Sequence, residues 1–139
     1  MSGPCVLDAS MAMSFVLADE HTAESQEALR RIAAEGAVVP AHWDFEVANA
    51  LFTAERRGRL AEADLVHALQ ALRALPVSPQ TSRPDSQRII GLARQFALSI
   101  YDAAYLDLAI ELNMPLATLD TPLRQAAVRA GVQRVPPPD

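Results

Sequence analysis

The stretch Cys5-Val6-Leu7-Asp8-Ala9-Ser10 decides the fold, because an apolar run ends in an acid just before a helical segment begins. A short apolar run is typical of a buried strand, so we predict a strand at 4–7 and a helix at 10–17. Two further runs, Ala37-Val38-Val39 and Leu116-Ala117-Thr118-Leu119, have the same character. Short apolar strands that alternate with helices are typical of a parallel sheet covered on both faces. We therefore predict an α/β fold with a central, mainly parallel sheet.

The remaining elements follow from helical periodicity and from residues that stop a helix. Glycine ends several of the helical segments, since it takes the left-handed conformation at little cost. A weak edge strand is predicted at Leu75-Pro76-Val77, because proline cannot donate to a strand ladder. The other predicted helices are 22–35, 42–57, 61–73, 84–97, 102–112 and 122–130. We expect one domain over residues 1–139, with a proline-rich tail at about 135–139.

Composition and charge limit the class of protein. The chain has 139 residues and half of them are hydrophobic, which is enough to bury one core. The single cysteine, Cys5, excludes an internal disulfide. The first residues lack a signal-peptide pattern and no apolar run is long enough to span a membrane, so we expect a cytoplasmic protein. A net charge of −5 argues weakly against a nucleic-acid partner, but all 12 basic residues are arginine, which binds phosphate through two hydrogen bonds.

Four acids stand at strand ends or helix starts, namely Asp8, Glu46, Asp102 and Asp120. Ligands of open α/β sheets bind in the crevice beyond the carboxyl ends of the strands. Carboxylates gathered there would repel one another and raise one another's pKa unless cations compensated them. Oxygen ligands of this kind suit Mg²⁺ or Mn²⁺. The pattern predicts metal-assisted chemistry on a phosphate ester.

Each acid also has a purely structural explanation. Asp8 is a natural N-cap of the helix that follows it. Either Asp120 or Thr121 could cap the last helix, with Pro122 at its first position in the second case. Glu46 could be a solvated helix residue, and Ser99-Ile100-Tyr101-Asp102 fits a capping box. The joint pattern of four favours a site over four unrelated caps. A non-catalytic binding module, whose acids are only caps, remains the alternative function.

Other polar residues complete the predicted site. Ser10 and Asn49 could hydrogen-bond to a carboxylate that binds the metal and so orient it. Asp107 lies about 140° around its helix from Asp102, so we expect it to face solvent. The three histidines lack the spacing of a zinc site, and the chain has no glycine-rich phosphate loop.

The predicted helix 42–57 has two apolar faces. Trp43, Val47, Ala50, Leu51 and Ala54 share one face at 100° per residue, and Phe45, Ala48 and Phe52 share the opposite one. The second face either packs in a second layer of the chain's own core or binds a partner chain. The sequence leaves both alternatives open.

These residues, in this order, resemble the PIN-domain family and, within it, the VapC-type toxins of bacterial toxin–antitoxin pairs. The stretches that carry the resemblance are Val6–Ser10, Pro40–Leu51, Leu98–Leu106 and Leu116–Leu123. The resemblance implies a three-layer α/β/α domain, a divalent-metal-dependent ribonuclease and a homodimer. It also implies inhibition by a cognate antitoxin whose peptide occupies the groove. The family's acids carry over to Asp8, Glu46, Asp102 and Asp120.

The residues and the resemblance together give a predicted mechanism. Asp8 and Asp102 hold Mg²⁺, or Mn²⁺ in its place, and Glu46 and Asp120 complete the pocket through water or a second ion. The ion would activate a water and stabilise charge on the phosphate. Single-stranded or looped RNA is the expected substrate. A phospho-accepting receiver domain fits less well, since it would need a lysine and the chain has none.

Overall fold

Four short parallel strands form the centre of the computed structural model, which describes residues 3–138. They are β1 (Cys5–Leu7), β2 (Ala37–Val39), β3 (Val77–Pro79) and β4 (Leu116–Ala117). The strand order is β3-β2-β1-β4, and each neighbouring pair runs parallel. The predicted parallel sheet is confirmed, and β3 is the edge strand that the sequence indicated, two residues later than expected.

Strand β1 is central because all of its side chains are apolar and fully buried. Its Val6 lies opposite Val38 of β2 and Leu116 of β4. The chain moves outward from β1 through β2 to β3 and then returns to the other side of β1 as β4. The point between β1 and β4 is therefore where the strand order reverses, and ligand sites of open α/β sheets form beyond the carboxyl ends at such a point.

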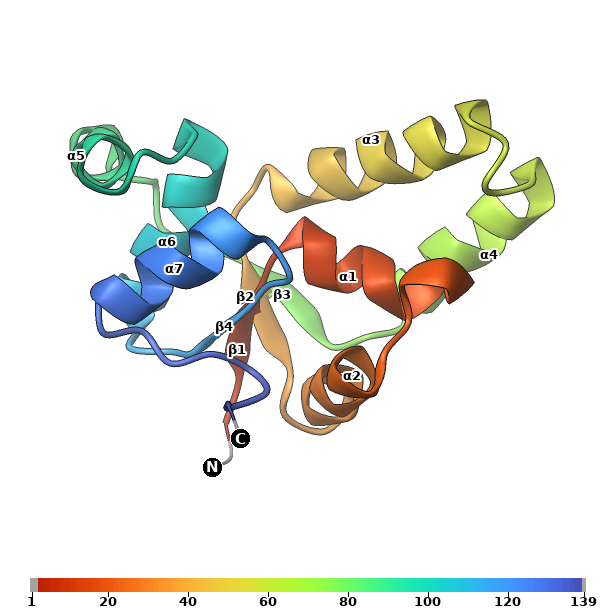
Figure 1. Cartoon of the computed structure of the whole chain (residues 1–139), viewed down its shortest axis with the longest axis horizontal. Helices are drawn as coiled ribbons and strands as arrows, with labels where there is room; N and C mark the ends of the chain where they lie inside the picture. Colours follow the sequence, from red (N-terminus) through yellow and green to blue (C-terminus); the bar gives the residue numbers. More distant parts are fainter. Residues whose placement is uncertain (1–2, 139) are drawn as a thin grey trace.

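Helices cover both faces of this sheet. They are α1 (Ala9–Val16), the short 3₁₀ helix η1 (Ala18–Glu20), α2 (Ala23–Glu35), α3 (Trp43–Arg56), α4 (Glu62–Arg73), α5 (Ser86–Phe96), α6 (Ile100–Leu112) and α7 (Thr121–Arg129). Figure 1 shows α1 to α4 on one side of the sheet and α5 to α7 on the other, which confirms the three-layer α/β/α fold. Among the described residues, no helix is long and apolar enough to cross a membrane.

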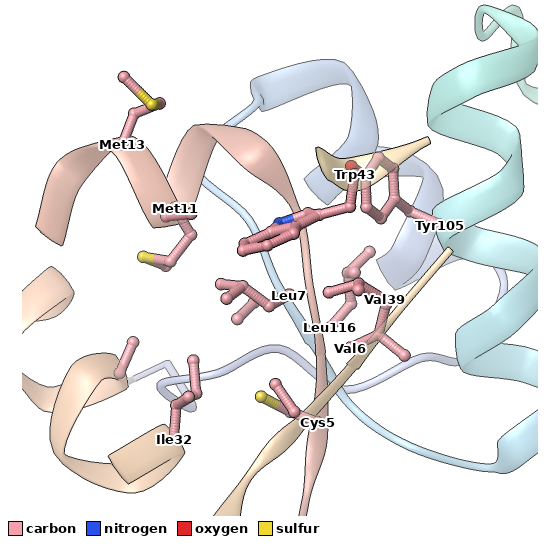
Figure 2. Close-up of a cluster of buried hydrophobic side chains, with 14 of the residues drawn as sticks. Cys5, Val6, Leu7, Met11, Met13, Ile32, Val39, Trp43, Tyr105 and Leu116 are labelled. Atoms are coloured by element: carbon pink, nitrogen blue, oxygen red, sulfur yellow. The ribbon is translucent and has the colours of Figure 1, made fainter. Parts of the chain in front are cut away.

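The core forms where the sheet, α1 and the start of α3 meet. Figure 2 shows Leu7, Met11 and Trp43 gathered in one cluster, with Tyr105 entering from α6. Leu7 and Met11 are fully buried. Burying such a side chain stabilises the folded state by about 2 kcal/mol, before the loss of side-chain entropy is subtracted. This packing fixes the first turn of α3 against the ends of the strands.

Only one face of α3 belongs to the core. Trp43, Val47 and Leu51 are buried as predicted, whereas Phe45 is 81% exposed and Phe52 is 52% exposed. The alternative in which the second face packs in the chain's own core is therefore wrong. The two phenylalanines lie on the surface of this chain.

The predicted C-terminal tail begins too early. Val135 is fully buried, and its N–H donates to the carbonyl of Leu116 at 3.0 Å. Arg134 forms an isolated parallel bridge with the same residue. The chain therefore packs beside β4 as far as Val135, because these backbone groups extend the ladder past the sheet edge. Asp139, the end of the predicted tail, lies outside the described residues.

The prediction that Asp107 faces solvent is wrong. The residue is 2% exposed, and its Oδ1 accepts from Arg88 Nε at 2.5 Å while Oδ2 accepts from Nη2 at 3.1 Å. The face of α6 that carries Asp107 is covered by α5, and the arginine arrives from that helix. The hydrogen bond and charge of Asp107 hold the pKa of the Arg88 guanidinium above its ordinary value.

Replacing Arg88 by leucine is expected to lower the melting temperature by several degrees. The change leaves the Asp107 carboxylate buried without its cation, which costs more than the pair itself contributes. Thermal melts followed by circular dichroism measure the effect, with Arg94→Leu, an exposed arginine on the same helix, as the control. The double variant Arg88→Leu/Asp107→Asn should recover part of the loss. An unchanged melt for Arg88→Leu would contradict this role of the pair.

Candidate functional site

Asp8 follows β1 directly and begins α1. Its Oδ1 accepts from the backbone N–H of Met11 at 2.9 Å, so it is the N-cap of α1. Its side chain is 4% exposed. Ser10 Oγ lies 2.8 Å from Oδ1 and 2.9 Å from Oδ2, and Thr118 Oγ1 donates to Oδ2. Asp8 is therefore a cap and also the centre of a hydrogen-bond network that reaches β4.

The network joins the ends of β1 and β4. Thr118 follows β4, and its Oγ1 accepts from the N–H of Asp120 at 3.0 Å. Ser10 Oγ accepts from the N–H of Leu119 at 2.9 Å. These bonds hold the two strand ends together at the point where the strand order reverses.

The sequence did not single out Thr118 as a site residue. The signal that could have found it is the spacing Thr118-x-Asp120, since alternate residues of an extended segment point to the same side. A threonine at a strand end, two residues before an acid, can therefore contact the same neighbouring groups as the acid. Ser10 does lie beside Asp8, as expected.

The pKa of Asp8 is raised from an ordinary 3.8 to about 6. Burial is the largest cause, because it disfavours the charged form. Hydrogen bonds from Thr118, Met11 and Ser10 act in the opposite direction, and the charge of Asp102 adds to the rise. The charge of Asp102 acts in the direction expected of clustered carboxylates, but burial is the main cause of the raised pKa.

Asp102 lies in the first turn of α6 without capping that helix. Ser99 is the N-cap, and its Oγ accepts from the N–H of Asp102 at 3.1 Å. Burial raises the pKa of Asp102, and the charge of Asp120 and then that of Glu46 raise it further. Asp102 therefore interacts with acids from three other segments, Asp8 included.

Asp120 caps α7 through its Oδ2, which accepts from the N–H of Leu123 at 3.0 Å. Of the two capping alternatives in the sequence, Asp120 rather than Thr121 is the one that forms. The cap engages one carboxylate oxygen, and Oδ1 accepts no hydrogen bond within residues 3–138.

Glu46 is half-buried and held by an aromatic side chain. Tyr105 Oη donates to Glu46 Oε1 at 2.5 Å, and His42 Nε2 lies 3.5 Å from the same oxygen. Burial and this bond raise the pKa of Tyr105, so it stays a donor. Asn49, one turn further along α3, is exposed, and its side chain makes no hydrogen bond to the described part of the chain. Within residues 3–138, Asn49 thus makes no contact of the orienting kind that the sequence predicted for it.

The donor set suits a hard divalent cation held by few protein ligands. In the described part of the chain, Asp8, Asp102 and Asp120 form no ion pair with a basic side chain, although two of them have raised pKa values. The charged form of a buried carboxylate such as Asp8 is unfavourable unless a cation compensates it. Within residues 3–138, no three or more His, Cys, Asp or Glu side chains are arranged to hold an ion together. Mg²⁺ does not need such a cage, because it keeps several waters and binds one or two carboxylates.

Replacing Thr118 by valine is expected to raise the pKa of Asp8 above about 6. Valine has nearly the same shape but cannot donate to the charged carboxylate, so the charged form loses support. Carboxyl ¹³C NMR titration measures the pKa, and Thr81→Val, in an exposed loop, is the control. An unchanged Asp8 pKa would show that the Thr118 hydroxyl does not support the charged carboxylate.

Comparison with protein families and curated proteins gives one consistent result. The PIN domain family matches residues 5–129 of the chain. VapC ribonuclease Mb0985 of Mycobacterium bovis is 38% identical over 115 residues, which cover 83% of this chain and 84% of that protein. Ribonuclease VapC12 of Mycobacterium tuberculosis is 32% identical over 121 residues, covering 87% and 90%. Ribonuclease VapC3 of the same species is 37% identical over 123 residues, covering 87% and 85%.

A solved structure has the same fold. The crystal structure of PAE2754 from Pyrobaculum aerophilum superposes with a TM-score of 0.69 and covers 90% of this chain and 84% of that one. Its sequence is 21% identical, so the likeness concerns the fold alone.

Proposed function

The chain belongs to the PIN-domain family and is similar to VapC ribonucleases, and from this we propose that it is a divalent-metal-dependent endoribonuclease. We further propose that it is the toxin component of a toxin–antitoxin pair. The observation that carries the catalytic proposal is the state of Asp8: it is buried, its pKa is raised, and the charge of Asp102 contributes to that rise. The nuclease domain is proposed to span residues 1–139.

Asp8 and Asp102 are the proposed direct ligands of Mg²⁺, or of Mn²⁺ in its place. Glu46 and Asp120 complete the acidic pocket, through water or a second ion. When bound, the ion would polarise the phosphate and lower the pKa of a water. Cellular RNA as substrate implies that the protein acts in the cytoplasm.

The protein side chains hold the acids in place. Ser10 and Thr118 donate to Asp8 and fix its orientation, while Tyr105 fixes Glu46. Asp120 is the proposed acceptor of the water's proton, because its cap engages only Oδ2. Acceptance of a proton by a positioned carboxylate contributes about 10²- to 10⁴-fold to a rate.

The alternative function is a binding module whose acids are only caps. The capping bonds of Asp8 and Asp120 favour it, because each acid already stabilises a helix. The two functions differ in their need for a metal. The purified chain should cleave single-stranded RNA in Mg²⁺ or Mn²⁺ and stop in excess EDTA. Intact RNA under both metals would leave only the binding module.

A cognate antitoxin and a second copy of this chain are the proposed protein partners. Phe45 and Phe52 lie seven residues apart on α3 and present an apolar surface to solvent. Exposed apolar patches of this kind mark association surfaces. The two phenylalanines are proposed to contact one or both partners.

Phe45→Ser/Phe52→Ser is expected to weaken association without unfolding the chain, since both side chains are exposed. Light scattering measures the oligomeric state, calorimetry measures antitoxin affinity and circular dichroism checks folding. Val128→Ser, at a large exposed apolar residue on α7, is the matched control. A folded double variant with wild-type oligomeric state and antitoxin affinity would refute the partner surface.

A further inference from the structure

An exposed aromatic side chain stands next to the acid cluster. Tyr101 is 60% exposed and occupies the first turn of α6, immediately before Asp102. Large aromatic side chains are usually well buried, because each removes much apolar area from water. The position of Tyr101 beside a proposed metal ligand therefore calls for an explanation other than core packing.

A second ring holds Tyr101 to the frame of the site. The ring centroid of His42 lies 5.4 Å from that of Tyr101, with the planes tilted by 58°. On its other side, His42 meets Tyr105 edge-on, with centroids 5.0 Å apart and planes at 70°. Tyr105 is buried and donates to Glu46. The three rings thus form a row from the core to the surface, and its outermost member is Tyr101.

His42 serves this row as an aromatic surface. Its Nε2 is buried and lies 3.5 Å from Glu46 Oε1, but it makes no hydrogen bond within residues 3–138. Ring pairs at these separations favour tilted and edge-on arrangements and contribute beyond simple area burial. Tyr101 is therefore held at a fixed place beside Asp102 instead of moving freely in solvent.

The charges near the site do not favour a phosphate backbone. The acid cluster repels phosphates, and nucleic-acid binding usually depends on arginine or lysine. Arg124, whose Nε donates to the carbonyl of Thr118, also pairs with Glu24. Arg88, on the helix that packs against α6, pairs with Asp107. Both guanidinium groups are engaged, so an RNA near the acids would gain more from contacts with its bases.

We propose that Tyr101, supported by His42, stacks on a base of single-stranded RNA next to the phosphate that is cut. The inference rests on the proposed ribonuclease function and names a substrate contact for it. Single-stranded RNA is commonly bound by stacking of unpaired bases on aromatic side chains, which is tolerant of sequence. Tyr101 is then a substrate-binding residue, and His42 is the residue that positions it.

RNA binding without turnover tests this contact. The background is Asp120→Asn, which keeps Asp8 and Asp102 and slows cleavage. The probe is a fluorescein-labelled pool of short single-stranded RNAs of random sequence, in Mg²⁺. Tyr101→Leu and Tyr101→Ala should weaken binding by on the order of tenfold, while Tyr101→Trp should bind at least as tightly. Val128→Ala, at an exposed apolar residue on α7, is the control and should bind as the background does.

The tryptophan variant adds a readout that a merely structural role would not change. Trp43, the only natural tryptophan, is 6% exposed in the core, so its emission should respond little to RNA. A tryptophan at position 101 that stacks on a base should lose much of its emission when RNA is added. Circular dichroism checks that each variant is folded. Should the leucine variant unfold, this quenching decides the question.

The possible failures are distinguishable. Wild-type RNA affinity in Tyr101→Leu, or unquenched emission in Tyr101→Trp with RNA bound, overturns the stacking contact and leaves Tyr101 as a protein-contact residue. If those variants behave as expected but the wild-type chain cuts no RNA in Mg²⁺ or Mn²⁺, Tyr101 stacks on RNA as part of a binding module, and the nuclease function with its cut phosphate fails. Absence of RNA binding by every variant overturns both.

Discussion

Asp8→Asn is expected to lower RNA cleavage by on the order of 10²-fold or more, since it removes a proposed metal ligand. The change keeps the size of the side chain and its cap, because asparagine is as good an N-cap as aspartate. Folding should therefore survive, and the loss should be one of catalysis.

Initial cleavage rates at limiting Mg²⁺ measure this effect. Asp85→Asn is the matched control, since Asp85 caps α5 by accepting from the N–H of Arg88 at 3.1 Å. It undergoes the same chemical change at a cap outside the acid network. Asp85→Asn should cleave at the wild-type rate, and a wild-type rate in Asp8→Asn would reject the metal assignment of Asp8.

The same substitution is expected to stabilise the metal-free protein at neutral pH by up to about 3 kcal/mol. The pKa of Asp8 is raised to about 6 in the folded chain, against an ordinary value of 3.8. The folded state thus keeps its proton where the unfolded state releases it. The contribution of the protonated Asp8 to the free energy of unfolding is complete below pH 3.8, falls as the pH rises, and is lost above about pH 6.

Urea denaturation in EDTA, repeated across this pH range, isolates the contribution of Asp8. The quantity to follow is the difference in unfolding free energy between Asp8→Asn and wild type, because other titrating groups then cancel. The difference should grow from about pH 3.8 to about pH 6 and stay constant above. Millimolar Mg²⁺ should raise the wild-type melting temperature by binding the folded state. A difference that does not vary with pH would show that Asp8 titrates normally.

Local pattern was enough to predict most of the fold. The run Ala37–Val39 is β2 as predicted, because an apolar run bounded by glycine and proline leaves few alternatives. The buried face of α3 was also predictable, since helical periodicity alone places Trp43 and Val47 together. The likeness to PIN domains, read from the order of the motifs, is confirmed by the match over residues 5–129.

Contacts between distant segments were not predictable from local pattern. Asp107 is buried because α5 brings Arg88 to it. The helical periodicity of α6 alone does not show where α5 packs. Val135 is buried because it pairs with β4, although the prolines after it indicated a free tail. Thr118 belongs to the site because its hydroxyl, at the end of β4, donates to Asp8 at the end of the neighbouring strand β1.

Capping and metal binding do not exclude each other at this site. Asp8 and Asp120 are caps in the structure, so their presence at helix starts would be explained without a metal. Asp102 differs, because Ser99 caps its helix, and burial together with the charges of Asp120 and Glu46 raises the pKa of its carboxyl. Asp102 is therefore the residue at which the two explanations differ most.

Mn²⁺ binding by isothermal titration calorimetry, compared between wild type, Asp102→Asn and Asp85→Asn, tests most directly whether the acid cluster is a metal site. If the cluster is a metal site, wild type and Asp85→Asn bind Mn²⁺ alike and Asp102→Asn binds it on the order of tenfold more weakly or worse. Equal affinity in all three proteins, or no binding by wild type at millimolar Mn²⁺, would show that the acid cluster is not a metal site.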